Sequence, residues 1–352
     1  MARSLVFLDS FDHYDDLNQK WSNYGNDGAG IDLSGTRSRT GIGCCTLSAA
    51  FGPVLSINPI SGGALALMAC TAYYQPGLGD STSAGVIRFL STNSVATTDP
   101  VFRVGVNANL GLTCVDIFGN PFTGGISASN IVVPNAYNII EAKVFFVDAG
   151  GGSAIVRLNG VTVLTLTGIS TLLGSSGFLT CSSVQLGGPG GLGGGVHDDF
   201  TLWTSDSHTD NDFPGGLKIY AVLPSANGAL DEWTPLTPPN WSEVNEIPPG
   251  GDASYNSSAA PGNIDLYVYN PTLAGVPSGL TVVALQHSLC TRSDAGTPSV
   301  ASQVGGTAAA GVPVGGSYHF TPIQPYDQNP VAGRAWLLTD FPATQLGPNQ
   351  TA

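Results

Sequence analysis

The charged residues that normally cover the exposed faces of helices are scarce in this chain, whose 352 residues include only 4 Glu and 3 Lys. A helical protein relies on Glu, Lys, Arg and Gln at its solvent-facing positions. Here Thr, Ser, Asn, Gly and Val take their place, and these residues favour strands and turns. The 47 Gly and 24 Pro follow no period, which indicates many tight turns rather than a collagen-like helix. The composition therefore predicts an all-β protein.

A β-hairpin is predicted around Asn159-Gly160, which separates two alternating runs, 155–158 and 161–164. Asn-Gly tolerates the positive φ angles of a tight hairpin turn. Many other short apolar runs lie between turn residues, a pattern typical of a sandwich or jelly roll. Strands are expected at 5–8, 85–90, 101–106, 112–117, 138–147 and 199–204.

The composition changes after residue 187, where a glycine-rich loop covers 187–195 and a closing strand is expected over 197–203. The polar, turn-rich stretch 206–216 predicts a domain boundary. We therefore expect one domain over 1–210 and a smaller β-rich domain over 211–352. Within the second domain, strands are expected at 217–223, 264–269 and 280–286, followed by a tail at 335–338. The stretch near 293–316 consists almost entirely of small residues, which predicts a long low-complexity loop or a mobile edge hairpin.

The net charge of −14 disfavours binding to nucleic acid and to anionic lipid surfaces. No apolar run reaches the roughly 18 residues of a membrane-spanning helix, and the N-terminus lacks the shape of a signal peptide. We therefore expect no membrane insertion, and a product that is made in a cytoplasm and kept or assembled there.

The six cysteines show no metal-ligand spacing with the five histidines. They are expected to be reduced core residues, with an intersubunit disulfide as the alternative. The cysteines are Cys44, Cys45, Cys70, Cys114, Cys181 and Cys290.

Several segments of the first domain resemble the concanavalin A-like, laminin G-like jelly roll. They are Phe11-Asp12 with Trp21, 135–144, 156–160 and 198–200. In the second domain, 218–224, 233–235, 244–249 and 252–255 follow one another in an order that resembles a module found behind laminin G-like domains in structural proteins of tailed bacteriophages. The resemblance covers about residues 1–290.

This resemblance implies a virion component assembled in the host cytoplasm, such as a tail appendage, a tail fibre or a capsid-surface decoration protein. The partners that it implies are other virion proteins and further copies of the chain, with a trimer expected by analogy. The low charge of the surface agrees with extensive protein contacts, because interface centres are depleted in Lys, Glu and Asp.

Catalysis is not expected from the sequence. A glycosidase needs two carboxylates flanking the bond that is cleaved, and the four glutamates, Glu141, Glu232, Glu243 and Glu246, form no alternating strand motif. No Gly-x-Ser-x-Gly elbow with a histidine partner occurs, and the glycine-rich run lacks the Lys-Ser/Thr of a phosphate-binding loop. We therefore predict a non-enzymatic protein with no catalytic residues and no bound cofactor.

Two alternatives stay open. A Ca²⁺ site would need clustered oxygen ligands, and its candidates are Asp12, Asp15, Asp16, Asp198 and Asp199. Exposed aromatic rings could lie in the core, in a subunit interface or against sugars, and the candidates are Tyr73, Tyr74, Trp233 and Trp241. The alternative function is thus a glycan- or receptor-binding adhesion module on the virion surface. His197 is interpreted as an ordinary loop residue.

Overall fold

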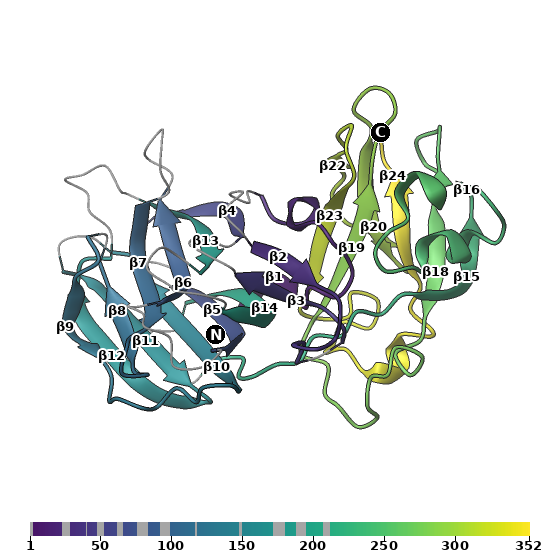
Figure 1. The fold of residues 1–352 in the computed structure, drawn as a ribbon. Coiled ribbons are helices and arrows are strands. Elements are labelled where there is room, and N and C mark those ends of the chain that lie inside the picture. Colours follow the sequence, from purple (N-terminus) through teal and green to yellow (C-terminus); the bar gives the residue numbers. More distant parts are fainter. Residues whose placement is uncertain are drawn as a thin grey trace. The chain divides into compact units, whose positions relative to one another are not determined.

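A computed structural model gives the fold of the chain (Figure 1). The structure describes residues 3–22, 29–39, 41–47, 53–61, 66–75, 84–91, 99–116, 118–147, 150–171, 180–187, 195–206 and 212–352. The predicted all-β class is confirmed: strands dominate the described residues, and the helical segments are short 3₁₀ turns.

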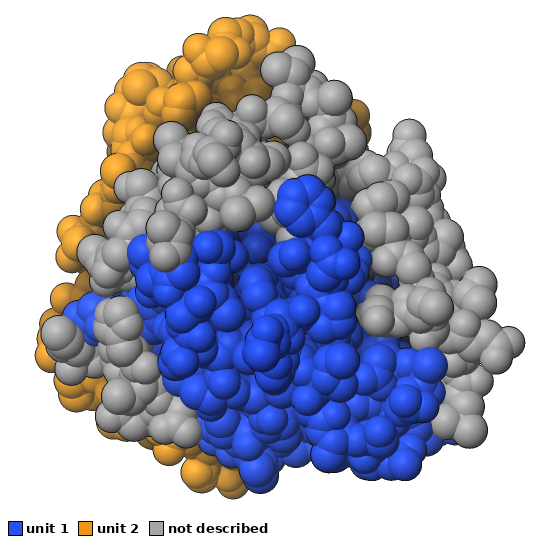
Figure 2. All heavy atoms as spheres, turned by 90° about the vertical axis from the view of Figure 1, so that its left-hand side faces the viewer, with its two compact units in different colours: residues 1–11, 21–219 blue, residues 12–20, 220–352 orange. Residues whose placement is uncertain are grey.

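The described residues form two compact units, coloured separately in Figure 2. The first unit comprises residues 1–11 and 21–219, and the second comprises residues 12–20 and 220–352. The short segment 12–20 belongs with the second unit because its rings pack there. The His13 and Tyr14 rings lie 5.0 Å and 5.7 Å from the ring of Phe320.

Two antiparallel sheets build the first unit. Sheet A runs in the order β12-β11-β10-β5-β14-β3-β2, with β1 paired to β14. Its strands are β1 (Ser4–Asp9), β2 (Ala29–Asp32), β3 (Cys44–Leu47), β5 (Ala66–Tyr74), β10 (Tyr137–Phe145), β11 (Gly152–Leu158), β12 (Val161–Ile169) and β14 (Val196–Ser205). Sheet B runs in the order β4-β13-β6-β7-β8-β9. Its strands are β4 (Val54–Ser61), β13 (Thr180–Leu186), β6 (Ala84–Ser91), β7 (Asp99–Val106), β8 (Leu112–Val115) and β9 (Pro121–Ile126).

The core of the first unit lies between the two sheets. Phe89 of β6 contacts Phe146, which follows β10, at a ring separation of 5.6 Å. Both rings are fully buried, so these positions mark the inner faces of sheets B and A. Because side chains alternate along a strand, the neighbours of Phe89 in sequence face away from this core. Five of the six cysteines are buried, and all six are free.

The second unit holds smaller sheets. The largest runs β15-β18-β24-β20-β21 with β22 on β20, and β16-β17 and β19-β23 form two further pairs. The strands are β15 (Pro224–Asp231), β16 (Thr234–Pro235), β17 (Asn256–Ser257), β18 (Asp265–Tyr269), β19 (Leu285–Thr291), β20 (Ser299–Val304), β21 (Thr307–Ala308), β22 (Val312–Pro313), β23 (His319–Tyr326) and β24 (Leu346–Gln350). The 3₁₀ turns are η1 (Leu17–Gln19), η3 (Asn240–Val244), η4 (Gly251–Ala253) and η5 (Leu338–Asp340). Trp336, Phe341, Val304 and Leu346 form its apolar core.

The hairpin predicted at Asn159-Gly160 is confirmed. It joins β11 to β12, and its two residues have φ angles of 50° and 81°. These left-handed angles are the ones that Asn and Gly adopt most readily.

Two sequence expectations for the second half are wrong. Residues 217–223 contain no strand, because backbone groups of this segment bond to the side chains of Arg39 and Asp199. Of the strand expected at 280–286, only the last two residues lie in a strand, at the start of β19. The stretch near 293–316, expected to be a long loop or an edge hairpin, contains β20, which pairs with β21 and β22 on one side and with β24 on the other. The glycine-rich run predicted over 187–195 lies mostly outside the described residues, as does part of the predicted boundary 206–216.

Candidate functional site

A polar row crosses three neighbouring strands of sheet B. Gln185 of β13 is paired in register with Arg88 of β6, and Arg88 is paired with Arg103 of β7. The neighbouring positions on these strands hold Val184, Phe89 and Phe102, all fully buried toward the core. The Gln185–Arg88–Arg103 row therefore lies on the face of sheet B that points away from the sandwich core. We call this the outer face of sheet B.

Arg88 is held in place by the amide of Gln185. Its Nη1 donates a hydrogen bond of 2.6 Å to Gln185 Oε1. Both side chains are buried, with 4% and 3% of their surface exposed. This hydrogen bond orders the Arg88 guanidinium, so its positive charge is held at a fixed place beside Arg103.

Arg103 is only half-buried and stands next to Arg88. Partial removal from water lowers the pKa of Arg103 below its ordinary value, and the charge of Asp116 opposes that shift. Asp116 itself follows β8 and holds a turn, because its Oδ1 accepts the backbone N–H groups of Phe118 and Asn120 at 2.9 Å each. The surroundings of Arg103 thus disfavour its positive charge, and a bound anion would relieve that penalty.

Two guanidinium groups at directly paired positions also repel each other, since like charges opposite one another destabilise a sheet. A carboxylate or another oxyanion between them would remove this repulsion and accept the fork of donors that Arg presents. Strand alternation places Ser183 and Thr113 on the same outer face, but both side chains are buried, so Arg103 is the member of this group that solvent reaches. The arrangement suits an acidic ligand.

None of the three residues of this row is among the candidates that the sequence suggested. The sequence does contain one indication of the two arginines: Arg88 interrupts the apolar stretch 86–90, and Arg103 interrupts the apolar stretch 101–104. The register that sets Gln185 beside Arg88 joins residues 97 positions apart, and local patterns do not reveal such a pairing.

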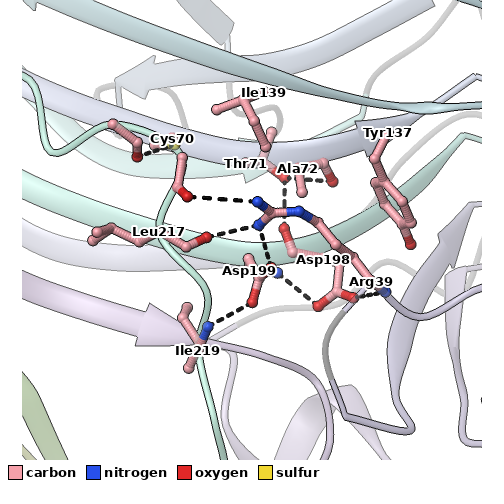
Figure 3. A network of polar contacts seen from close by, with 12 residues as sticks. Arg39, Cys70, Thr71, Ala72, Tyr137, Ile139, Asp198, Asp199, Leu217 and Ile219 are labelled. Carbon is pink, nitrogen blue, oxygen red and sulfur yellow. Dashed lines mark hydrogen bonds and ion pairs between the residues drawn. The ribbon is translucent and has the colours of Figure 1, made fainter. Parts of the chain in front are cut away.

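Asp198 and Asp199, two of the calcium candidates, bind Arg39 and backbone groups of the chain, as Figure 3 shows. The backbone N–H of Arg39 donates to Asp198 Oδ2 at 2.6 Å, and the Arg39 guanidinium lies 2.5 Å from Asp199 Oδ2. Asp199 Oδ1 accepts the backbone N–H of Ile219 at 2.7 Å, and Arg39 also donates to the carbonyl of Leu217. Both carboxylates are buried. They anchor the segment around 217–219 to sheet A.

The other calcium candidates lie in the 12–20 segment of the second unit. Asp12 is buried, whereas Asp15 and Asp16 are exposed, and Asp16 caps η1 by accepting the backbone N–H of Asn18 at 2.9 Å. Within the described ranges, no group of three or more His, Cys, Asp and Glu side chains is arranged to hold a metal ion.

His197 is not a loop residue, as the sequence suggested, but part of β14 inside the sandwich. Its Nδ1 lies 3.1 Å from Thr71 Oγ1, and its ring lies 5.1 Å from that of Tyr73. Burial lowers the pKa of His197 to about 3, so the ring is neutral at neutral pH. The Tyr73 ring is buried too, which keeps it from meeting a ligand.

The remaining aromatic candidates are partly exposed. The Tyr74 ring packs against Tyr137 at 5.6 Å. In the second unit, the Trp233 indole donates to the carbonyl of Asn263 at 3.2 Å, and the Trp241 backbone N–H donates to Asn227. Both tryptophans are half-buried. No helix of the described part of the chain is long and apolar enough to span a membrane.

No family model matches the chain, and no curated protein matches it. Among solved structures, an endo-β-1,4-glucuronan lyase from the fungus Trichoderma reesei is 11% identical, with 56% of this chain and 95% of that chain covered and a TM-score of 0.41. The cellulose-induced protein Cip1 is 13% identical, with 57% and 98% covered and a TM-score of 0.41. The alginate lyase Aly36B is 12% identical, with 53% and 87% covered and a TM-score of 0.35. At these identities the similarity concerns the fold and assigns no activity to this chain.

These comparisons correct two expectations from the sequence, namely that the chain is a structural component of a phage virion and that it is non-enzymatic. The solved structures that resemble it include lyases of polysaccharides and a sialidase, and the three described above are not phage proteins. Both expectations are therefore withdrawn.

Proposed function

We propose that this protein binds an acidic polysaccharide on the outer face of sheet B, where the half-buried Arg103 receives a carboxylate of the polymer and the buried Arg88 beside it adds positive charge. The observation that supports this most strongly is the register that sets two arginines side by side, with Gln185 orienting the first. Bidentate recognition by Arg is the usual way in which a protein binds a planar carboxylate.

Because the overall charge of the chain is negative, the arginines of the site determine whether an acidic polymer can bind. A chain of net charge −14 repels a polyanion over most of its surface, so affinity must come from a site where positive charge is concentrated. A neutral polysaccharide could accept hydrogen bonds from a guanidinium group but would gain no charge attraction. The proposal therefore predicts selectivity for acidic polymers.

Affinity electrophoresis tests the proposal with alginate, polyglucuronate and a neutral β-glucan of similar length. We expect retardation in the gels that contain an acidic polymer and none in the neutral gel. Equal retardation in all gels, or no retardation in any, would contradict the proposal. The same mixtures, assayed for new reducing ends, report whether a bound polymer is also cleaved.

A further inference from the structure

One aromatic side chain of the first unit is exposed, and it lies in the turn that joins β8 to β9 at one end of sheet B (Figure 1). The Phe118 side chain is 74% exposed, whereas every other Phe, Tyr and Trp that the structure describes in this unit is buried or half-buried. Phe122, four residues later, stacks on the core ring of Phe102 at 5.6 Å. A single exposed apolar residue is common on protein surfaces, so the surroundings of Phe118 decide whether it has a role.

The turn that carries Phe118 is closed by hydrogen bonds. Asp116 Oδ1 accepts the backbone N–H groups of Phe118 and Asn120 at 2.9 Å each. The backbone N–H of Asp116 donates to the carbonyl of Asn120 at 2.9 Å, and that of Gly119 donates to the carbonyl of Asp116 at 3.1 Å. Gly119 has a φ angle of 82°, which a glycine adopts without strain. Because the backbone is already ordered, a ligand that contacts the Phe118 ring has little loop entropy to overcome.

The same turn lies against Arg103. Arg103 is paired in register with Val115, the last residue of β8 before the turn. A Cβ atom built on Gly119 would lie 3.6 Å from Arg103 Nη2, which is the distance of a van der Waals contact. The charge of Asp116 also acts on Arg103. Consecutive Cα atoms are about 3.8 Å apart, so the exposed ring of Phe118 begins one residue away from the guanidinium to which we assign the carboxylate.

We propose that Phe118 is a second contact of the polysaccharide site, stacked on the face of the sugar ring whose carboxylate binds Arg103. This assignment rests on the proposed function and adds a ligand class to it, namely polymers of sugar acids rather than polyanions in general. A pyranose ring carries C–H groups on its faces and its hydroxyl and carboxylate groups around its edge. One sugar can therefore offer a carboxylate to an arginine and an apolar face to an aromatic ring. Apolar surface with a few charged groups that fix orientation is the usual composition of a ligand site.

The two contacts make separable contributions. A guanidinium recognises the carboxylate group and does not distinguish a sugar acid from an acidic peptide. The ring of Phe118 supplies that distinction, because an aspartate side chain has no broad apolar face to cover it. Salt screens the attraction between exposed charges but has little effect on an apolar contact. Affinity for a sugar acid should therefore depend on both residues, and only the part due to Arg103 should weaken with salt.

Isothermal titration with an alginate oligosaccharide and with an aspartate oligopeptide of equal charge tests this assignment. The wild type should bind the oligosaccharide at least about tenfold more tightly than the peptide, and Phe118→Ala should remove that difference, since burial of an apolar ring contributes on the order of tenfold in affinity. Phe118→Trp keeps a flat ring and should retain the preference. Ile42→Ala is the matched control, because Ile42 is an exposed apolar residue between β2 and β3, which lie at the end of sheet A opposite β12.

Two results would overturn the role of Phe118 while leaving the arginine site in place. The first is a wild type that binds the oligosaccharide and a Phe118→Ala variant that binds it as tightly. The second is an equal loss for the oligosaccharide and the peptide, which would mean that the turn only positions Arg103. The loss caused by Phe118→Ala should also be the same at about 50 mM and about 500 mM NaCl. A wild type that does not bind the oligosaccharide would instead contradict the proposed function, and the role of Phe118 with it.

Discussion

The ammonium group of Lys143 lies 2.5 Å from a carboxylate oxygen of Asp212, and the Lys143 side chain is completely buried. Lys143 belongs to β10, whereas Asp212 belongs to the segment that leaves the first unit. Ser205 donates a further hydrogen bond to the same carboxylate. The pair therefore fixes the course of the chain after β14.

Removal of the Asp212 charge should destabilise the first unit strongly. Asp212→Asn removes the carboxylate that lies 2.5 Å from this buried ammonium, and breaking a buried pair costs about 3–5 kcal/mol. Thermal unfolding monitored by circular dichroism should show a large fall in Tm. The matched control is Asp294→Asn, which removes an exposed partner of Arg292 and should leave the Tm almost unchanged. A similar Tm for both variants would contradict this account of Lys143.

Acid should destabilise the second unit through His287. Burial lowers the pKa of His287 to about 4, and its Nδ1 lies 2.6 Å from the hydroxyl of Ser302. An unfolded histidine has a pKa of about 6.5. Between these two values the unfolded chain binds more protons than the folded chain, so stability is complete above about pH 6.5 and falls as the pH drops toward 4.

The magnitude of this effect is about 1.4 kcal/mol per pH unit for one proton. Denaturant unfolding at pH 7.5 and at pH 5 should therefore show a clear loss of stability for the wild type. His287→Gln removes the titrating group and should show a smaller loss between the two pH values. His197 contributes in the same direction and should leave some pH dependence in that variant. An unchanged pH dependence in His287→Gln would exclude the role given to this histidine.

Gly347 should tolerate no side chain. A Cβ atom at this position of β24 would lie 1.9 Å from the carbonyl oxygen of Asp265 in β18. Gly347→Ala must push the two strands apart, and overpacking of this kind costs about 1–3 kcal/mol or more. Gly306→Ala is the control, because nothing lies within 4 Å of a Cβ built there. Chemical denaturation of both variants measures the difference, and equal stabilities would contradict the close approach of the two strands.

Much of the fold could be predicted because its signals are local. The scarcity of Glu and Lys excluded helices, and Asn159-Gly160 marked a hairpin whose φ angles the structure reproduces. Strand β20 could not be predicted in this way, since only Val300 and Val304 of its six residues favour strands, and Ser, Ala and Gln separate them. Pairing with β24, almost fifty residues later, holds it in place.

The candidate site could not be predicted from the sequence for the same reason, because it depends on pairing between residues that are far apart along the chain. Arg88 and Arg103 are ordinary single charges when read along the chain, and only strand pairing sets them next to each other. The prediction of aspartates as metal ligands failed for the opposite reason, because closeness in the sequence was taken as closeness of function. Asp198 and Asp199 are clustered in sequence, but the structure uses them to bind Arg39 and the backbone of Ile219.

The proposal of an acidic ligand depends above all on Arg103, the more accessible member of the row. Isothermal titration with an alginate oligosaccharide should show that Arg103→Gln weakens binding about tenfold or more, because a charged hydrogen bond contributes about 1.5–3 kcal/mol. Arg37→Gln removes an exposed arginine away from sheet B and should bind like the wild type. If Arg103→Gln bound the oligosaccharide as tightly as the Arg37→Gln control, the outer face of sheet B would not be the binding site.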